Sequence, residues 1–148
     1  ILLVGDARGT YADALKKRCQ ALPTHSRDRI QIIPPTEEIA SFYAAADLFV
    51  LSSKVESFPR VVLEAMVFGL PIITTPVFGV REQVVERENA LFYPPGGSRL
   101  LAEQIQCLVC DDARRLQMAE RSRQRVGQMT TFEEMVDAYA GICKEAVS

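Results

Sequence analysis

The fold is decided by residues 48–66, which read LFVLSSKVESFPRVVLEAM. Residues 48–51 are wholly apolar, which is typical of a strand that is buried on both faces of a parallel sheet. Pro59 then starts a helical pattern that runs to Gly69, since the fixed φ of proline suits the first turn of a helix. We therefore expect a strand–loop–helix unit here, and in α/β folds such loops are where ligands bind.

Short apolar runs and helical patterns alternate in the same way along the rest of the chain. We expect strands at residues 1–5, 29–33, 48–51, 71–74 and 90–92. We expect helices at residues 11–22, 59–69, 80–87 and 98–110, followed by a helical tail over about 111–146. This order predicts the α/β class, with residues 1–148 forming a single domain around a doubly wound parallel sheet. The arrangement is Rossmann-like, with three layers in the order α/β/α.

Short polar side chains predict where further helices begin. We expect N-caps at Thr36, Ser98 and Thr131. The first of these helices would carry Ile39, Phe42 and Tyr43 on its apolar face, with Glu37 and Glu38 in its first turn. The last would follow a break in the helical tail near residues 127–131.

Composition excludes several classes of function. The formal net charge is −2, from 17 basic and 19 acidic residues, so no basic excess indicates a nucleic-acid partner. No apolar run approaches the roughly 18 residues that a membrane span needs. The four cysteines are scattered, which fits a reducing compartment and hence a cytoplasmic protein. Cys107 and Cys110 have CxxC spacing, but they lie in an apolar helical stretch and are interpreted as helix residues.

The loop before the helix at 59–69 has the chemistry of an anion site. The free N–H groups of the first turn and the helix dipole together suit a diphosphate. Glu56 lies just before this helix and Glu64 lies one turn into it, so both can face one crevice. Carboxylates accept hydrogen bonds from sugar hydroxyls. The alternative is that Glu56 only complements the helix dipole and Glu64 is a solvated residue, and spacing alone leaves both interpretations open.

Two other loops are ambiguous. Gly5 and Gly9 follow the first strand, and Gly79 follows the fourth. Each glycine could let backbone approach a phosphate, or could simply serve a tight turn.

Four segments together resemble the C-terminal domain of the family 4 (group 1) glycosyltransferases. They are residues 46–53, 56–66, 69–75 and 89–96, and they include a Glu-x7-Glu pair followed by a glycine and a proline at the next strand. The resemblance implies one half of a two-domain GT-B architecture. The N-terminal acceptor domain of the same full-length chain would then lie before Ile1. The implied reaction is transfer of a sugar from a nucleoside-diphosphate sugar to an acceptor, with retention at the anomeric carbon.

The resemblance also implies roles for individual residues. Glu64 would hold the ribose hydroxyls, and Glu56, at the catalytic position, would lie beside the donor sugar. The donor sugar and diphosphate would meet the backbone of the loop that contains Ser57, Phe58, Pro59, Arg60 and Val61.

Gly5 and Gly79 would lie close to the donor, and Ile33 and Pro34 near its base. Three positions depart from the family pattern. The family often has glycine where this chain has Ala7, Pro34 and Phe78.

We expect no cofactor beyond the nucleotide-sugar substrate, and no metal, since no divalent metal cluster is visible in the sequence. The full-length enzyme could associate peripherally with a membrane. Two alternatives remain open. One is half of a sugar-nucleotide epimerase, and the other is a non-catalytic nucleotide-binding module in which Asp6 and Ser52 line a pocket.

Overall fold

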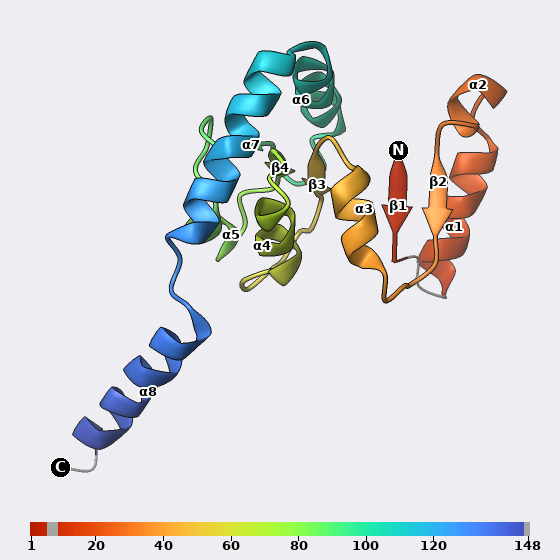
Figure 1. Ribbon diagram of the computed structural model, residues 1–148. Helices are drawn as coiled ribbons and strands as arrows, with labels where there is room; N and C mark the ends of the chain where they lie inside the picture. The colour runs from red at the N-terminus through yellow and green to blue at the C-terminus, as the bar shows by residue number, and fades with distance from the viewer. Residues whose placement is uncertain (6–8, 147–148) are drawn as a thin grey trace. The chain divides into compact units, whose positions relative to one another are not determined.

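The structure is a computed structural model that describes residues 1–5 and 9–146 (Figure 1). By its internal contacts the chain divides into two compact units, Ile1–Phe42 and Tyr43–Ser148. Each unit is described by itself.

The first unit contains two parallel strands. Strand β1 (Leu2–Val4) pairs with β2 (Gln31–Ile33), with Leu3 opposite Ile32. Helices α1 (Thr10–Gln20) and α2 (Thr24–Arg27) connect them. The sequence did not predict α2, because a helix of four residues carries no apolar period. Helix α3 (Ile39–Ala45) follows β2 and crosses the boundary between the units.

The second unit is built on three parallel strands in the order β3-β4-β5. These are β3 (Phe49–Leu51), β4 (Ile72–Thr74) and β5 (Ala90–Phe92), with Val50, Ile73 and Leu91 side by side in register. The three β4 residues have no exposed surface. A central strand that is covered on both faces explains why two consecutive apolar residues, Ile72 and Ile73, stand here in place of an alternating pattern.

Five helices of the second unit follow its strands. They are α4 (Arg60–Val67), α5 (Val80–Gln83), α6 (Ser98–Cys110), α7 (Asp112–Gly127) and α8 (Phe132–Ala146). Helix α4 packs on β3, β4 and α7, whereas α6 packs on β4 and α7 (Figure 1). A core cluster joins β4 and β5 to α6 and α7, and it consists of Ile73, Leu91, Tyr93, Leu108 and Met118.

Two expected helix starts are wrong. Helix α3 begins at Ile39, so Glu37 and Glu38 lie before its first turn. The Thr36 hydroxyl instead accepts a hydrogen bond from the Glu38 N–H (3.1 Å), a local turn that competes with helix formation. Ser98 is the first residue of α6 and not its cap, and Gly97 precedes it without any side-chain cap.

The helix expected at 80–87 is also too long, because α5 ends at Gln83. The next residue, Val84, is extended (φ −124°, ψ 155°), as suits a β-branched side chain. The Asn89 side chain then accepts a hydrogen bond from the Val85 N–H (2.8 Å), which holds a loop where the helix would have continued.

The tail is helical as expected, and Thr131 is confirmed as a cap. The Glu134 N–H donates to the Thr131 hydroxyl (3.2 Å), while the Glu134 carboxylate accepts from the Thr131 N–H (2.7 Å). This reciprocal pair is a capping box. The tail has one further break, where Asp111 ends α6 and caps α7 by accepting from the Arg114 N–H (2.9 Å).

Candidate functional site

The loop between β3 and α4 presents an uncapped helix N-terminus. Pro59 is the N-cap (φ −69°, ψ 117°), so the helix begins at Arg60, one residue later than the sequence predicted. No side chain of the described residues caps the helix. The Val62 N–H bends back to the Pro59 carbonyl (3.1 Å). The N–H groups of Arg60 and Val61, at the first two positions of the helix, cannot find a partner within it. The sequence predicted free N–H groups at this helix start, and such groups are suited to binding an anion.

Glu64 lies on the second turn of α4 with both carboxylate oxygens engaged. Arg60 donates to Oε1 from Nη2 (3.1 Å) and Nε (3.3 Å). The Tyr43 hydroxyl donates to Oε2 (3.0 Å). The side chain of Glu64 is 31% exposed, so it is still open to a ligand. Glu64 is therefore more constrained than a solvated surface residue.

The Tyr43 hydroxyl is a neutral donor at physiological pH. Burial raises its pKa well above the ordinary value, and the hydrogen bond to Glu64 raises it further. The proton therefore stays on Tyr43, and the carboxylate of Glu64 remains the acceptor.

Glu56 is held within the same loop. Its Oε1 accepts a hydrogen bond from the Ser53 hydroxyl (2.6 Å), and its side chain is half-buried. Ser53 is itself fixed, because the Thr75 hydroxyl at the end of β4 donates to its carbonyl. The two strand ends β3 and β4 thus hold the loop that carries Glu56.

Gly79, in the loop after β4, packs closely against the loop that carries Glu56. A Cβ atom at position 79 would overlap the Ser57 carbonyl oxygen and would lie 3.2 Å from the Phe58 ring. The φ of Gly79 is an ordinary −63°, so glycine is needed here for space and not for conformation. The sequence left open what Gly79 approaches, and in the structure its close contact is with Ser57, a residue of the candidate site.

Phe78, which stands where the family often has a second glycine, adopts φ 40°. This left-handed conformation is uncommon for a bulky side chain and is strained. Its ring is largely exposed, beside the Gly79 contact with Ser57.

Sequence reasoning missed three supporting residues of the site. Tyr43 was expected only as part of an apolar helix face. Thr75 directly follows the strand expected at residues 71–74. Gln83, which is fully buried, donates from Nε2 to the Pro59 carbonyl (3.1 Å) and so fixes the helix start. None of the three has a sequence signal, because each acts through a contact at least 21 residues away in the chain.

The remaining predicted positions lie in the first unit. Gly5, with φ 90°, donates its N–H to the Ile33 carbonyl (3.0 Å), so these two residues are neighbours at the ends of β1 and β2. Pro34 follows and is exposed. Asp6 and Ala7, which the sequence placed in the first loop, lie outside the described residues.

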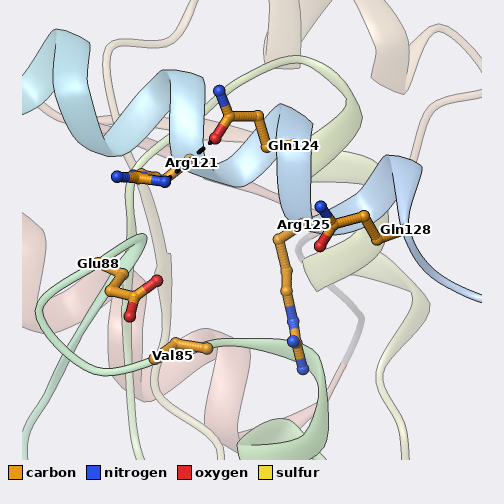
Figure 2. A pocket seen from close by; sticks show the side chains of 6 residues that line it. All are labelled: Val85, Glu88, Arg121, Gln124, Arg125 and Gln128. Carbon is orange, nitrogen blue, oxygen red and sulfur yellow. Dashed lines mark hydrogen bonds between the residues drawn. The ribbon is translucent and has the colours of Figure 1, made fainter.

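A separate pocket of about 120 Å³ lies between α7 and the segment that follows α5 (Figure 2). It is lined by Val85, Glu88, Arg121, Gln124, Arg125 and Gln128, none of which the sequence predicted as a site residue. Arg125 donates to the carbonyls of Glu82 (2.7 Å) and Gln83 (3.3 Å), so it stabilises the end of α5. The pocket is smaller than the roughly 300–1,000 Å³ typical of sites for small organic ligands.

Neither a metal centre nor a membrane span is visible in the part of the chain that the structure describes. No group of three or more His, Cys, Asp or Glu side chains within residues 1–5 and 9–146 could hold a metal ion. Over the same residues, no helix is both long and apolar enough to cross a bilayer. Cys107 and Cys110 are free thiols on α6.

Comparison with known proteins gives consistent matches. Residues 1–125 match the sequence model of the family described as glycosyl transferases group 1. The chain is 30% identical over 149 residues to the D-inositol 3-phosphate glycosyltransferase of Xylanimonas cellulosilytica, covering 97% of this chain and 36% of the relative.

Solved structures share the fold. The crystal structure of Anabaena HepE in complex with UDP matches 97% of this chain and 40% of HepE, with a TM-score of 0.85 and 26% identity. Sucrose-phosphate synthase from Thermosynechococcus elongatus matches 99% of this chain and 39% of its own length, with a TM-score of 0.81 and 28% identity. These likenesses confirm the expected Rossmann-like half of a GT-B fold. The chain spans somewhat more than a third of the length of these proteins.

Proposed function

The chain belongs to the group 1 glycosyltransferase family, and from that premise we propose that it is the donor-binding domain of a retaining glycosyltransferase. The full-length enzyme would transfer a sugar from a nucleoside-diphosphate sugar to an acceptor held by an N-terminal domain. Anabaena HepE, with which this chain shares its fold at 26% identity, was crystallised both with UDP and with UDP-glucose. That supports a nucleotide sugar as the donor.

The observation that carries this proposal is the fixed carboxylate of Glu64 beside the uncapped start of α4. A carboxylate has about four acceptor positions, and the bond from Tyr43 uses one of them. Two ribose hydroxyls can therefore bind once the exposed Arg60 side chain turns away from Glu64. The backbone N–H groups of Arg60 and Val61 would donate hydrogen bonds to the diphosphate.

Glu56 would accept a hydroxyl of the donor sugar. Its bond from Ser53 fixes the side chain and leaves acceptor capacity. In this arrangement the two glutamates position the donor, and they do not act as the acid and nucleophile of a glycosidase, because one of them is committed to ribose. Their contribution is orientation.

Charge on the departing diphosphate would be stabilised by the α4 dipole and by cations elsewhere in the full-length enzyme. No metal ion or other cofactor is part of this proposal. We place the enzyme in the cytoplasm, where nucleotide sugars would be its substrates, and treat residues 1–148 as its C-terminal domain.

The proposal is tested by titrating UDP, GDP and ADP against the full-length protein by calorimetry. We expect one nucleotide to bind best and Glu64→Ala to weaken it about 10- to 100-fold, because a charge-assisted hydrogen bond contributes roughly 1.5–3 kcal/mol. Glu56→Ala should weaken free nucleotide by less than about threefold, but should reduce turnover of the nucleotide sugar by at least about tenfold.

Glu103→Ala is the matched control, since Glu103 also pairs with an arginine four residues before it (Arg99 Nε, 3.0 Å) on an exposed helix face outside the site. It should bind nucleotide as the wild type does. Absence of saturable binding of all three nucleotides at millimolar concentration would overturn the proposal. Unchanged affinity in Glu64→Ala would overturn the assignment of Glu64 to ribose.

A further inference from the structure

Tyr43 is a buried aromatic residue whose ring is fixed from two sides. It lies on α3 and is 7% exposed. Its ring stacks on Phe68, just after α4, with centroids 5.5 Å apart and planes inclined by 25°. On β3, Phe49 packs against it at 6.0 Å in a tilted arrangement. These contacts fix the direction of the hydroxyl before any ligand arrives.

The hydroxyl of Tyr43 holds Glu64 more firmly than Arg60 can. Arg60 has a side chain that is 89% exposed, and an exposed i,i+4 ion pair contributes little to holding either partner in place. The guanidinium can therefore swing away when an anion binds nearby. Tyr43 cannot, because its ring is packed between Phe49 and Phe68. The conformation of Glu64 thus depends on a single buried donor at Oε2.

We propose that Tyr43 is a positioning residue for the donor nucleotide, which acts by holding the carboxylate of Glu64 in the orientation that accepts the ribose hydroxyls. This inference rests on the proposed function of Glu64. Tyr43 is not itself a ligand contact in this scheme, because its hydroxyl is already committed to Oε2 and its ring is enclosed. By holding Glu64 in one conformation before the ligand binds, Tyr43 lowers the conformational entropy that is lost on binding.

The test is Tyr43→Phe in the full-length protein, which keeps the ring stack and removes only the hydroxyl. We expect the affinity for UDP to fall about 3- to 10-fold, as for the loss of one hydrogen bond. The affinity for 2′,3′-dideoxy-UDP should change by less than about twofold, because that ligand offers no hydroxyl to Glu64. In a Glu64→Ala background, Tyr43→Phe should have little further effect on UDP, since the carboxylate that Tyr43 holds is already absent.

Tyr93→Phe is the matched control for lost stability. Tyr93 is also buried in the second unit, and its hydroxyl donates to the Leu51 carbonyl (3.3 Å). It should leave the preference for UDP over 2′,3′-dideoxy-UDP unchanged.

If Glu64→Ala still weakens the binding of UDP, two results would overturn the inference alone. One is unchanged UDP affinity in Tyr43→Phe, and the other is an equal loss for UDP and for 2′,3′-dideoxy-UDP. A third result, Glu64→Ala binding UDP as the wild type does, would overturn the inference together with the ribose assignment on which it rests.

Discussion

Gly79 shows how one residue without a side chain can determine the shape of a neighbouring loop. We expect Gly79→Ala to destabilise the protein by about 1–3 kcal/mol, because the new Cβ would displace the Ser57 carbonyl from a packed position. The displacement would also move the N-terminus of α4. Thermal unfolding and nucleotide titration on the same preparation measure both effects, and we expect a lower Tm together with weaker binding.

Gly141→Ala is the control for this change. Apart from the adjoining backbone of α8 itself, no heavy atom of the described residues lies within 4 Å of a Cβ built at position 141, in the interior of the helix. Alanine there should therefore be neutral or stabilising by about 0.5–1 kcal/mol. Wild-type stability and nucleotide affinity in Gly79→Ala would show that the loop does not depend on this contact.

The sequence could predict only those site residues that lie within one recognisable stretch of the chain. Glu56, Pro59 and Glu64 lie close together in a loop and helix whose type can be read from apolar pattern and proline. Tyr43 and Gln83 reach the site from other elements, and their hydrogen bonds to Glu64 and to the Pro59 carbonyl depend on tertiary packing. No spacing in the sequence brings those atoms together, so only coordinates reveal them.

Helix α8 depends on its own capping box at its first turn. We expect Thr131→Ala to increase amide exchange in the first turns of α8 about fivefold, because loss of a threonine N-cap typically costs about 1 kcal/mol of helix stability. Hydrogen exchange followed by mass spectrometry measures this effect locally. Glu133→Gln, which removes a first-turn charge but no capping hydrogen bond, should have a smaller effect.

The same cap should be sensitive to acid. Hydrogen bonds from the Thr131 backbone and hydroxyl hold the pKa of Glu134 below its ordinary value. A folded-state pKa below the unfolded value means that the stabilisation is complete above the unfolded pKa of about 4.3 and is lost as the pH falls through the folded pKa. Equal protection of α8 at neutral pH and in this acidic range would contradict a role for the ionised carboxylate.

The ends of other elements were harder to predict than their existence. Each observed strand overlaps the range that the sequence predicted, but α3 begins later than expected, and α5 ends earlier. In both cases a side chain takes the place of a helical backbone bond, with Thr36 accepting from Glu38 and Asn89 accepting from Val85. Side chains that bond to nearby backbone compete with the helix, and propensity alone does not say which wins.

Across the whole molecule, burial is concentrated in the second unit. Among the described residues of the first unit, Ala12 alone is a buried apolar residue, whereas β4 and the helices around it contain most of the core. The apolar runs at 1–4 and 48–51 look alike in sequence. A run of apolar residues predicts a strand, but it does not say how much of that strand the neighbouring elements cover. The division of the chain into two units therefore could not be predicted from the sequence.

Alkaline pH should destabilise the folded chain through Tyr43. Burial, reinforced by Glu64, raises the pKa of Tyr43 above the unfolded value of about 10. The folded state then binds its proton more tightly than the unfolded state does, so the stabilisation is complete below pH 10 and is lost as the pH rises toward the folded pKa. Urea unfolding between pH 8 and about 11 should therefore show a falling free energy of unfolding, with a slope of at most about 1.4 kcal/mol per pH unit from this one group.

Tyr43→Phe should flatten that fall, because phenylalanine cannot ionise, whereas Tyr139→Phe, at an exposed position on α8, should reproduce the wild-type slope. Identical slopes in the wild type and in Tyr43→Phe would mean that the hydroxyl is not held by Glu64 in the folded protein, and they would remove the physical basis for its role at the donor site.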